Sequence, residues 1–549
     1  MKSASWFEII AARCWNVLNE GKTFTPVFVL SVFLLANRFD VDWLRLGEAL
    51  LLTLPLFLVY YVFDFPLHMR WFLLGPLISF VAMYGYWNGR LLLWAFGLYT
   101  FFTVFFWGTL YYHLRIGTTW WNFTRIWKLF LRNSDSTSGN VFEQLPKVFL
   151  LLLVLDWSYH GLAAAGSAGR ETGAGNTDWG AGIADRGAVA GTGGLFAGTA
   201  ASGAPIDWVA YAGFVAGVAV FSWLVHRLLF NWKPQEYPTY TSNAEVSRPL
   251  AKRAVVIVID GCRKERFEQA DAPFLHHLRT TGVYYDRMET VYPARTVVCF
   301  SSMFTGTYPR EHGIRSNMVW KLGVRVESVF DKLKQQGRKG ILFGCAHLID
   351  AFGDYVESFT SVEKNDIVDH KIMARAKEIM RRENPDLMVI QLIAVDQTGH
   401  SRGVLYPEYL EKIRETDRLI EDFYRWMEQE GFHDDTVVAV MADHGQGNGI
   451  GGHGHLDEGE RFVPFLLHGP CMKRGVEVKE LRSIVSLAPT LCYLLGIPYP
   501  DKSRGPVLLE AIDPLADRSQ DVADQSWSDT ETAKRELQHE ETDRRDSGF

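Results

Sequence analysis

Long apolar runs in the first 232 residues constrain the fold of this chain more than any other feature. A helix needs about 20 mostly apolar residues to cross the hydrocarbon layer of a membrane. Trp and Tyr gather at the ends of the runs, as they do at membrane–water interfaces. The runs are too long and too poor in charge for buried core helices. We therefore predict an α-helical multi-span membrane domain over residues 1–232, with spans at 46–65, 71–87, 91–112, 148–165 and 208–232 and a sixth candidate at 24–36.

Three further segments of the chain lack the pattern of a packed core. The Gly/Ala-rich stretch 166–204 has little periodicity, so we predict a flexible loop between the last two spans. Residues 233–250 are predicted to be a linker. The tail 513–549 is charged and poor in apolar residues, which predicts disorder.

The pattern changes after the linker to strands that alternate with helices. Residues 254–259, 387–395 and 436–441 are continuous apolar runs typical of buried parallel strands, and 340–343 and 462–467 are weaker candidates. This alternation predicts an α/β domain over 251–512, with a mostly parallel sheet covered by helices on both faces. The net charge of -7 argues against a nucleic-acid-binding surface, which needs a basic face.

Polar residues at the ends of these strands form the candidate site. Three strands end in an aspartate: Asp260, Asp396 and Asp443. Four histidines follow these aspartates closely: His400, His444, His453 and His455. One such Asp is usually a turn residue and one such His is usually packed, but parallel strands bring their carboxyl ends together at the edge where ligands bind. A mixed Asp/His set suits zinc, with manganese as the alternative, better than calcium, and it is large enough for two divalent ions.

A hydroxyl nucleophile is predicted at the start of a helix. Thr296 follows a turn at Pro293, where backbone N–H groups and a metal ion would activate and steady it. The alternative is that Thr296 only caps the helix. Cys299 lies about one turn further along, and no general base is placed beside it in the sequence, so we discount it as the nucleophile.

The order of these motifs over residues 254–498 resembles the alkaline phosphatase superfamily, specifically its type I phosphodiesterase/nucleotide pyrophosphatase branch. The motifs are VIDG, P-x-x-T, TGTYPREHGI, D-x-x-x-H, ADHG and a late His. The resemblance implies that one metal ion is held by Asp260, Thr296, Asp443 and His444. It implies that the other is held by Asp396, His400 and His453. It further implies that Thr296 is the nucleophile of a phospho-enzyme intermediate and that Asn317, if not merely a turn residue, donates to a phosphate oxygen.

Two departures separate the chain from nucleotide pyrophosphatases. The residues after Thr296 are VVCF, and the late His follows ADHG closely. The short spacing is more similar to the ethanolamine-phosphate transferases of GPI-anchor assembly, which are also multi-span membrane proteins. It leaves His453 and His455 as alternatives, and we prefer His453 on spacing.

Three functions follow as expectations. The first is a membrane-anchored two-metal phosphodiesterase acting on a phosphodiester or phospholipid-type substrate. The second is transfer of a phospho-headgroup, such as phosphoethanolamine, onto a lipid or glycan. The third is a membrane transporter or sensor whose metal-binding domain is not catalytic. In all three the chain is multi-pass in the cell membrane, with the lipid bilayer as its partner.

The side of the membrane on which the α/β domain lies has conflicting indicators. Basic residues place the loop 114–147 in the cytoplasm, so counting 148–165 as a span keeps the α/β domain inside, and omitting it puts the domain outside. Asp156 and His160 weaken that span. Five of the six cysteines lie in the C-terminal half, an odd number that mildly favours a reducing compartment. Relatives with this architecture mostly place the domain outside, which is the side we favour.

Overall fold

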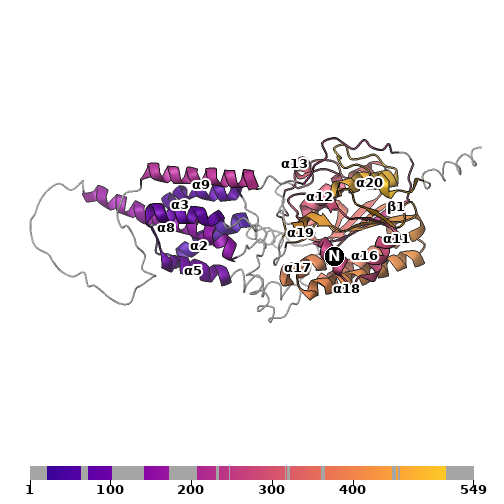
Figure 1. Ribbon diagram of the computed structural model, residues 1–549, viewed down its shortest axis with the longest axis horizontal. Coiled ribbons are helices and arrows are strands. Elements are labelled where there is room, and N and C mark those ends of the chain that lie inside the picture. Colours follow the sequence, from indigo (N-terminus) through magenta and orange to yellow (C-terminus); the bar gives the residue numbers. More distant parts are fainter. Residues whose placement is uncertain are drawn as a thin grey trace, which may run out of the picture. The chain divides into compact units, whose positions relative to one another are not determined.

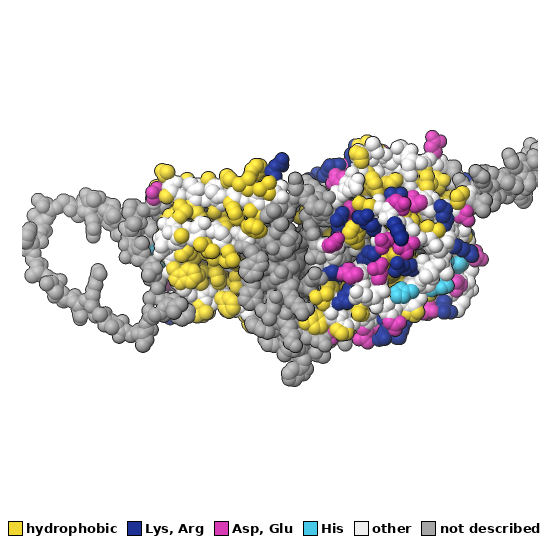
Figure 2. Space-filling model, in the orientation of Figure 1, with side chains coloured by type: hydrophobic (Ala, Val, Ile, Leu, Met, Phe, Trp, Pro, Cys, Tyr) yellow, Lys and Arg dark blue, Asp and Glu magenta, His cyan; other side chains and the backbone are white. Residues whose placement is uncertain are grey.

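The computed structural model describes residues 21–63, 72–101, 141–171, 207–229, 234–246, 248–315, 317, 322–359, 365–447, 453–454 and 458–514 (Figure 1). Within these residues the chain forms two compact units. The helical unit holds the N-terminal helices and also residues 398–406, 446–447 and 453–454, and the α/β unit holds the other described residues from 234 onward. Figure 2 shows hydrophobic side chains over much of the visible face of the helical unit and charged side chains over the α/β unit. The division between an apolar first half and a charged second half therefore holds at the surface as well as along the chain.

The helical unit is built around one long buried helix. Its helices are α2 (Gly21–Ala36), α3 (Trp43–Val62), α4 (Leu74–Tyr84), α5 (Gly89–Thr100), α8 (Val141–Glu171) and α9 (Trp208–Leu229). Helix α8 packs against α2, α3, α4 and α5, and residues 150–155 have no exposed surface. Large apolar side chains of α3 and α9, such as Leu51, Leu58 and Val209, point outward instead. Exposed apolar side chains on helices of this length are typical of surfaces that face lipid.

Among the described residues, three helices are long and apolar enough to cross a membrane: Trp43–Val62, Leu145–Leu162 and Trp208–Leu228. The other predicted spans are shorter in the described part of the chain. The predicted span 71–87 is corrected to the 11-residue helix α4, which stops at Gly85 because that residue adopts a left-handed conformation. The predicted span 91–112 contributes α5, of 12 residues, and residues 102–112 lie outside the described part. The candidate 24–36 forms most of the 16-residue α2.

The polar residues that weakened the span at 148–165 are accommodated inside the helical unit. Asp156 is buried, and its Oδ2 accepts hydrogen bonds from the Tyr86 hydroxyl (2.6 Å) and the Asn88 amide (2.7 Å). Nδ1 of His160 lies 3.6 Å from Asp156 Oδ1. The segment between α4 and α5 thus satisfies the carboxylate, and α8 continues through Asp156 without a break.

The Gly/Ala-rich loop begins later than predicted. Residues 166–171 still belong to α8, since the alanines before them favour helix, so the prediction of a loop is wrong for these six residues. The rest of the loop, residues 172–204, and the tail from residue 515 lie outside the described residues.

The α/β unit is organised by an eight-stranded, mostly parallel sheet. Its strand order is β10-β2-β9-β7-β1-β6-β4-β5, and a small second sheet has the order β11-β3-β8. The strands are β1 (Arg253–Ile259), β2 (Val283–Tyr285), β3 (Met288–Glu289), β4 (Gly340–Gly344), β5 (Val356–Ser358), β6 (Leu387–Leu392), β7 (Thr436–Met441), β8 (Phe462–Val463), β9 (Phe465–His468), β10 (Val476–Val478) and β11 (Arg482–Ser483). Strand β1 lies between β6 and β7 and is parallel to both, so these three carboxyl ends lie side by side.

Helices cover both faces of the sheet, as predicted. They are α10 (Lys264–Gln269), α11 (Pro273–Thr281), α12 (Thr296–Thr305), α13 (Pro309–His312), α14 (Val329–Gln335), α15 (Ile349–Phe352), α16 (Asn365–Glu383), α17 (Ala394–Arg402), α18 (Pro407–Gln429), α19 (Glu458–Arg461) and α20 (Leu487–Leu495). Helices α12 and α20 lie on one face, and α16 and α18 lie on the other (Figure 1). The predicted fold class, an α-helical membrane part joined to an α/β part with a mostly parallel sheet, is confirmed.

Two predicted strands are corrected. The run 387–395 ends as a strand at Leu392, and Ala394 already begins α17. The run 462–467 splits into β8 and β9, which belong to different sheets. The split falls at Pro464, whose nitrogen has no hydrogen to donate to a strand ladder.

Candidate metal and active site

The strand order brings two carboxylates to one point on the edge of the sheet. Asp260 directly follows β1, and Asp443 lies two residues beyond the end of the adjacent strand β7. Both side chains are buried. Gly261 adopts a left-handed conformation (φ 64°), and its N–H donates to Asp443 Oδ1 (3.1 Å). This turn after β1 therefore holds the two carboxylates together.

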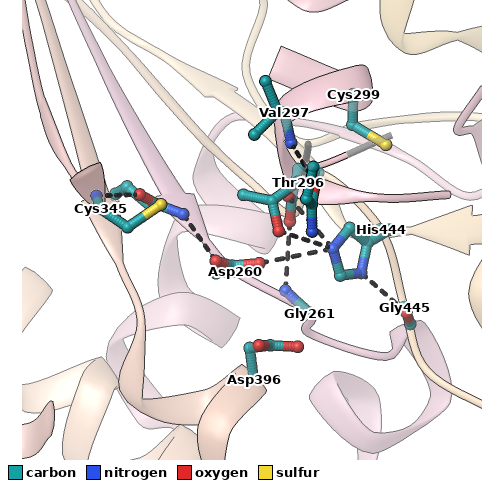
Figure 3. A network of polar contacts seen from close by, with 12 residues as sticks. Asp260, Gly261, Thr296, Val297, Cys299, Cys345, Asp396, His444 and Gly445 are labelled. Atoms are coloured by element: carbon teal, nitrogen blue, oxygen red, sulfur yellow. Dashed lines mark hydrogen bonds and ion pairs between the residues drawn. The ribbon is translucent and has the colours of Figure 1, made fainter. Parts of the chain in front are cut away.

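His444 presents a defined ring nitrogen to these carboxylates. Its Nδ1 lies 2.9 Å from the backbone oxygen of Gly445, which can only accept, so Nδ1 carries the hydrogen. The lone pair of Nε2 then faces Asp260 Oδ1 at 3.5 Å (Figure 3). It also faces Asp443 Oδ2 at 3.4 Å. This is the tautomer that can bind a metal ion through Nε2.

Two carboxylate oxygens in this group have no hydrogen-bond partner among the described residues. They are Asp260 Oδ1 and Asp443 Oδ2, the atoms nearest His444 Nε2. A buried carboxylate oxygen without a donor is costly, and a divalent cation would supply the missing partner. Burial, together with the neighbouring carboxylates of Asp443 and Asp396, also raises the pKa of Asp260 well above its usual range. A bound cation would reverse this shift by favouring the ionised carboxylates. The residues present therefore fit a metal ion.

A second group of ligand atoms shares the His444 ring. Asp396, His444 and His453 each offer an atom within 4.8 Å of the others, as do Asp260, Asp443 and His444. The prediction that Asp396 ends a strand is wrong, because Asp396 lies in the first turn of α17. His400 is one turn further along the same helix, and its ring centre lies 5.1 Å from that of His453. The alternative ligand His455 lies outside the described residues.

Thr296 is the first residue of α12 and faces the first group. Its Oγ1 lies 3.4 Å from His444 Nε2. The capping position is occupied by Arg295, so a role as the N-cap does not explain Thr296. Asn317 Oδ1 accepts the N–H of Val297 (3.0 Å), which leaves the Asn317 amide nitrogen, a donor, on the other side of the side chain.

Cys299 has the opposite character. Its side chain is fully buried, and burial beside Asp443 raises the pKa of the thiol well above its usual range. Its Sγ lies 3.3 Å from the hydroxyl of Thr290. A thiol in this environment stays protonated, which agrees with its exclusion as a nucleophile.

Three residues that support the site were not predicted. Gly261 holds Asp443, as described above. Asp369 accepts the N–H groups of Ile393 (2.9 Å) and Ala394 (3.0 Å) and so caps the start of α17, which carries Asp396. Gln391 donates to Asp260 Oδ2 (2.6 Å). Two signals were visible in the sequence: the glycine of the VIDG motif, which is Gly261, and a Gln inside the apolar run LMVIQL.

Comparison with known proteins confirms the resemblance drawn from the motifs. Residues 254–341 and 345–489 match the family of type I phosphodiesterases and nucleotide pyrophosphatases. The human GPI ethanolamine phosphate transferase 3, catalytic subunit, is 28% identical over 350 residues, which cover 56% of this chain and 31% of that protein. Venom phosphodiesterase 2 from Crotalus adamanteus is 22% identical over 213 residues, covering 35% and 26%.

Among solved structures, murine ectonucleotide pyrophosphatase/phosphodiesterase 5 is similar over 45% of this chain and 96% of its own. The TM-score is 0.40 and the sequence identity is 13%. The chain spans about a third or less of the length of the two curated relatives named above.

Proposed function

We propose that this protein is a membrane-anchored, metal-dependent enzyme that cleaves phosphodiesters through Thr296. The match of its α/β unit to the type I phosphodiesterases and nucleotide pyrophosphatases supports this proposal. One observation carries the proposal. The Thr296 hydroxyl, His444 Nε2 and the carboxylate oxygens of Asp260 and Asp443 that accept no hydrogen bond from the described residues converge on one point. The third candidate function, a transporter or sensor without catalysis, does not require a hydroxyl at this point.

We assign the proposed ligands to two separate ions. Asp260, Asp443, His444 and Thr296 would hold one divalent ion, and Asp396, His400 and His453 would hold the other. Zinc fits this mixed nitrogen and oxygen set best, with manganese as the alternative. When bound, such a pair of ions lowers the pKa of an attacking hydroxyl and stabilises charge on the attacking and leaving oxygens.

The proposed reaction proceeds in two steps. Thr296 Oγ1 forms a bond to phosphorus while the bond from phosphorus to one ester oxygen breaks, and the threonine proton leaves with the released alcohol. The N–H of Val297 is taken by Asn317 Oδ1, so other backbone N–H groups at the start of α12 would donate to the phosphoryl oxygens, together with the Asn317 amide nitrogen. Water or a second alcohol then attacks the phosphothreonine and restores the Thr296 hydroxyl.

A transferase is the second candidate, and it differs only in the acceptor of the second step. The GPI ethanolamine phosphate transferases among the relatives and the three long apolar helices favour a lipid or glycan alcohol as that acceptor. A phospholipid donor labelled in its headgroup, supplied with and without an acceptor lipid, separates the two candidates. Release of the free headgroup phosphate alone indicates a hydrolase, and label on the acceptor indicates a transferase.

The nucleophile is tested by replacing Thr296 with alanine in the purified full-length chain. Thr296→Ala should abolish cleavage of bis(4-nitrophenyl) phosphate and the trapping of labelled phosphate on the protein, and it should retain most of the bound zinc. Cys299→Ala is the matched control and should keep both activities, because its buried thiol faces Thr290. Wild-type cleavage by Thr296→Ala would contradict the assignment. Absence of cleavage by the metal-loaded wild type would favour the transporter or sensor.

We also propose that the α/β unit lies outside the cytoplasm, on the strength of the family resemblance. The native cysteines are poor probes of this, because Cys262, Cys299, Cys471 and Cys492 are buried. A cysteine introduced at the exposed position Lys334 avoids the problem. Labelling of Lys334→Cys by an impermeant reagent in intact cells is expected. Labelling only after lysis would place the unit in the cytoplasm.

A further inference from the structure

A buried glutamine connects one proposed metal ligand to the backbone of a neighbouring strand. Gln391 lies near the end of β6 and pairs in register with Val258 on β1, two residues before Asp260. Its side chain is fully buried within an otherwise apolar strand. Buried polar groups are almost always hydrogen-bonded, and both ends of this amide are used.

The orientation of the amide follows from its partners. The backbone N–H of Cys345, just after β4, donates to Gln391 Oε1 at 2.7 Å. A backbone N–H can only donate, so the oxygen must face Cys345 and the amino group must face Asp260. Gln391 Nε2 accordingly donates to Asp260 Oδ2 at 2.6 Å. In Figure 3, Asp260 lies between Cys345 and His444.

Because of this contact, the two oxygens of Asp260 have different surroundings. Oδ2 is held by Gln391, whereas Oδ1 has no hydrogen-bond partner among the described residues and lies 3.5 Å from His444 Nε2. A donor on one oxygen fixes the rotation of the carboxylate and so aims the other oxygen. Without the donor, the plane of the carboxylate could turn away from His444.

Gly344 makes room for the amide. A Cβ atom added at Gly344, the last residue of β4, would lie 2.5 Å from Gln391 Oε1 and 3.2 Å from Gln391 Cβ. Strand β4 pairs with β6, so the absence of a side chain at this position lets the amide fit against the neighbouring strand. Two positions on adjacent strands therefore combine to hold one carboxylate.

From these contacts we propose that Gln391 is a positioning residue that aims Asp260 Oδ1 at the metal ion held with Asp443 and His444. The proposal rests on the proposed function, because it requires that ion. Gln391 itself touches neither substrate nor metal. Its effect is confined to the ion that uses Asp260, whereas the ion that uses Asp396 does not depend on it.

The test measures two zinc affinities in the full-length protein by competition with a chromophoric chelator. Gln391→Met keeps a similar volume and removes both hydrogen bonds. It should weaken one of the two zinc ions by about 10- to 100-fold, the usual effect of losing a residue that orients a metal ligand, and leave the other ion unchanged. Gly344→Ala should weaken the same ion, because its Cβ displaces the amide.

A control variant separates positioning from a general loss of packing. Thr490→Val removes a buried hydroxyl of α20 that donates to Ser486 O (2.7 Å) and accepts from the Leu508 N–H (3.0 Å). It should leave both zinc affinities at their wild-type values. In an Asp260→Ala background, Gln391→Met should cause no further change in zinc affinity, because the ligand that it positions is gone.

The remaining outcomes separate a failure of this inference from a failure of the proposed function. Wild-type affinities for both ions in Gln391→Met, or equal weakening of both, would overturn the role of Gln391 and leave the proposed function intact. If the wild type binds no zinc, the proposed function and this inference fail together. If it binds two ions and cleaves no phosphodiester, only the proposed function fails.

Discussion

Replacing Gly261 with alanine should disrupt the candidate site more than its size suggests. Gly261 has a φ of 64°, its N–H donates to Asp443, and its carbonyl accepts the hydroxyl of Tyr409 (2.6 Å). A Cβ atom at this position would lie 2.4 Å from Asp396 Oδ1, 2.8 Å from Asp396 Cβ and 3.0 Å from Asp396 Cα. The added Cβ therefore collides with Asp396, a proposed ligand of one ion. The same backbone holds Asp443, a proposed ligand of the other ion.

Gly261→Ala should cause two losses, one in folding stability and one in the rate of catalysis. A non-glycine residue in the left-handed region costs roughly 1–2 kcal/mol of folding stability. Relief of the contacts with Asp396 requires a shift of about half to one ångström, since carbon atoms in contact prefer about 3.5–4.0 Å. Because the Asp396 Cα is involved, rotation of the side chain alone cannot supply this shift. A misplacement of about 1 Å in an active site can lower the rate about 100-fold.

A matched variant at Gly337 separates the loss of rate from the loss of folding stability. Gly337 has a similar φ of 69°, and nothing lies within 4 Å of a Cβ added there. Gly337→Ala should lose the same 1–2 kcal/mol of stability and keep full activity and metal content. Gly261→Ala should lose zinc and about 100-fold of its rate on bis(4-nitrophenyl) phosphate. Equal activity and zinc content in the two variants would refute the reasoning.

Two further changes probe buried polar groups away from the site. His312 accepts the N–H of Ile314 (3.1 Å) and lies 2.9 Å from the Ser302 hydroxyl, and burial lowers its pKa to about 3. Between pH 6.5 and 3 the His312 ring is therefore protonated in the unfolded chain but not in the folded one. Lowering the pH through this window should reduce the free energy of unfolding by up to about 1.4 kcal/mol per pH unit. His312→Gln should flatten that slope in denaturant unfolding, and an unchanged slope would exclude His312 as its source. Asp156→Leu removes the acceptor that the buried Tyr86 hydroxyl and the half-buried Asn88 amide share, and it should cost about 1–3 kcal/mol for the buried hydroxyl left unpaired. Asp156→Asn keeps an acceptor and should cost less, as thermal unfolding in detergent would report; equal losses would argue against these hydrogen bonds.

The pattern of residues along the chain was enough for the architecture and most of the candidate site. Apolar runs predicted helices of the N-terminal unit, and strand–helix alternation predicted the parallel sheet. Asp260 and Asp443 were found from their places at strand ends, since neighbouring parallel strands end at one edge of a sheet. Thr296 was found because a turn and a helical pattern meet there, and the structure begins α12 at that residue.

Other features depended on contacts between distant segments. The helix α4 stops at Gly85, inside the predicted span 71–87. The run 387–395 changes from strand to helix although its apolar residues continue through Val395. Asp156 looked like a defect in a span because its partners, Tyr86 and Asn88, lie about 70 residues away in the chain. Hydropathy counts each residue alone, and it cannot register a partner that satisfies a carboxylate.

The sequence by itself determined most of the side chains of the candidate site, because residue type and position relative to a strand end are local properties. Only the tertiary structure decided how they are aimed. The His444 ring presents Nε2 because Gly445 O accepts from Nδ1, and Asp260 presents Oδ1 because Gln391 holds Oδ2. The orientation of Asp260 arises from a hydrogen bond between adjacent strands that are distant in the chain. Hydrogen bonds of this kind exist only after the sheet has set the register of its strands.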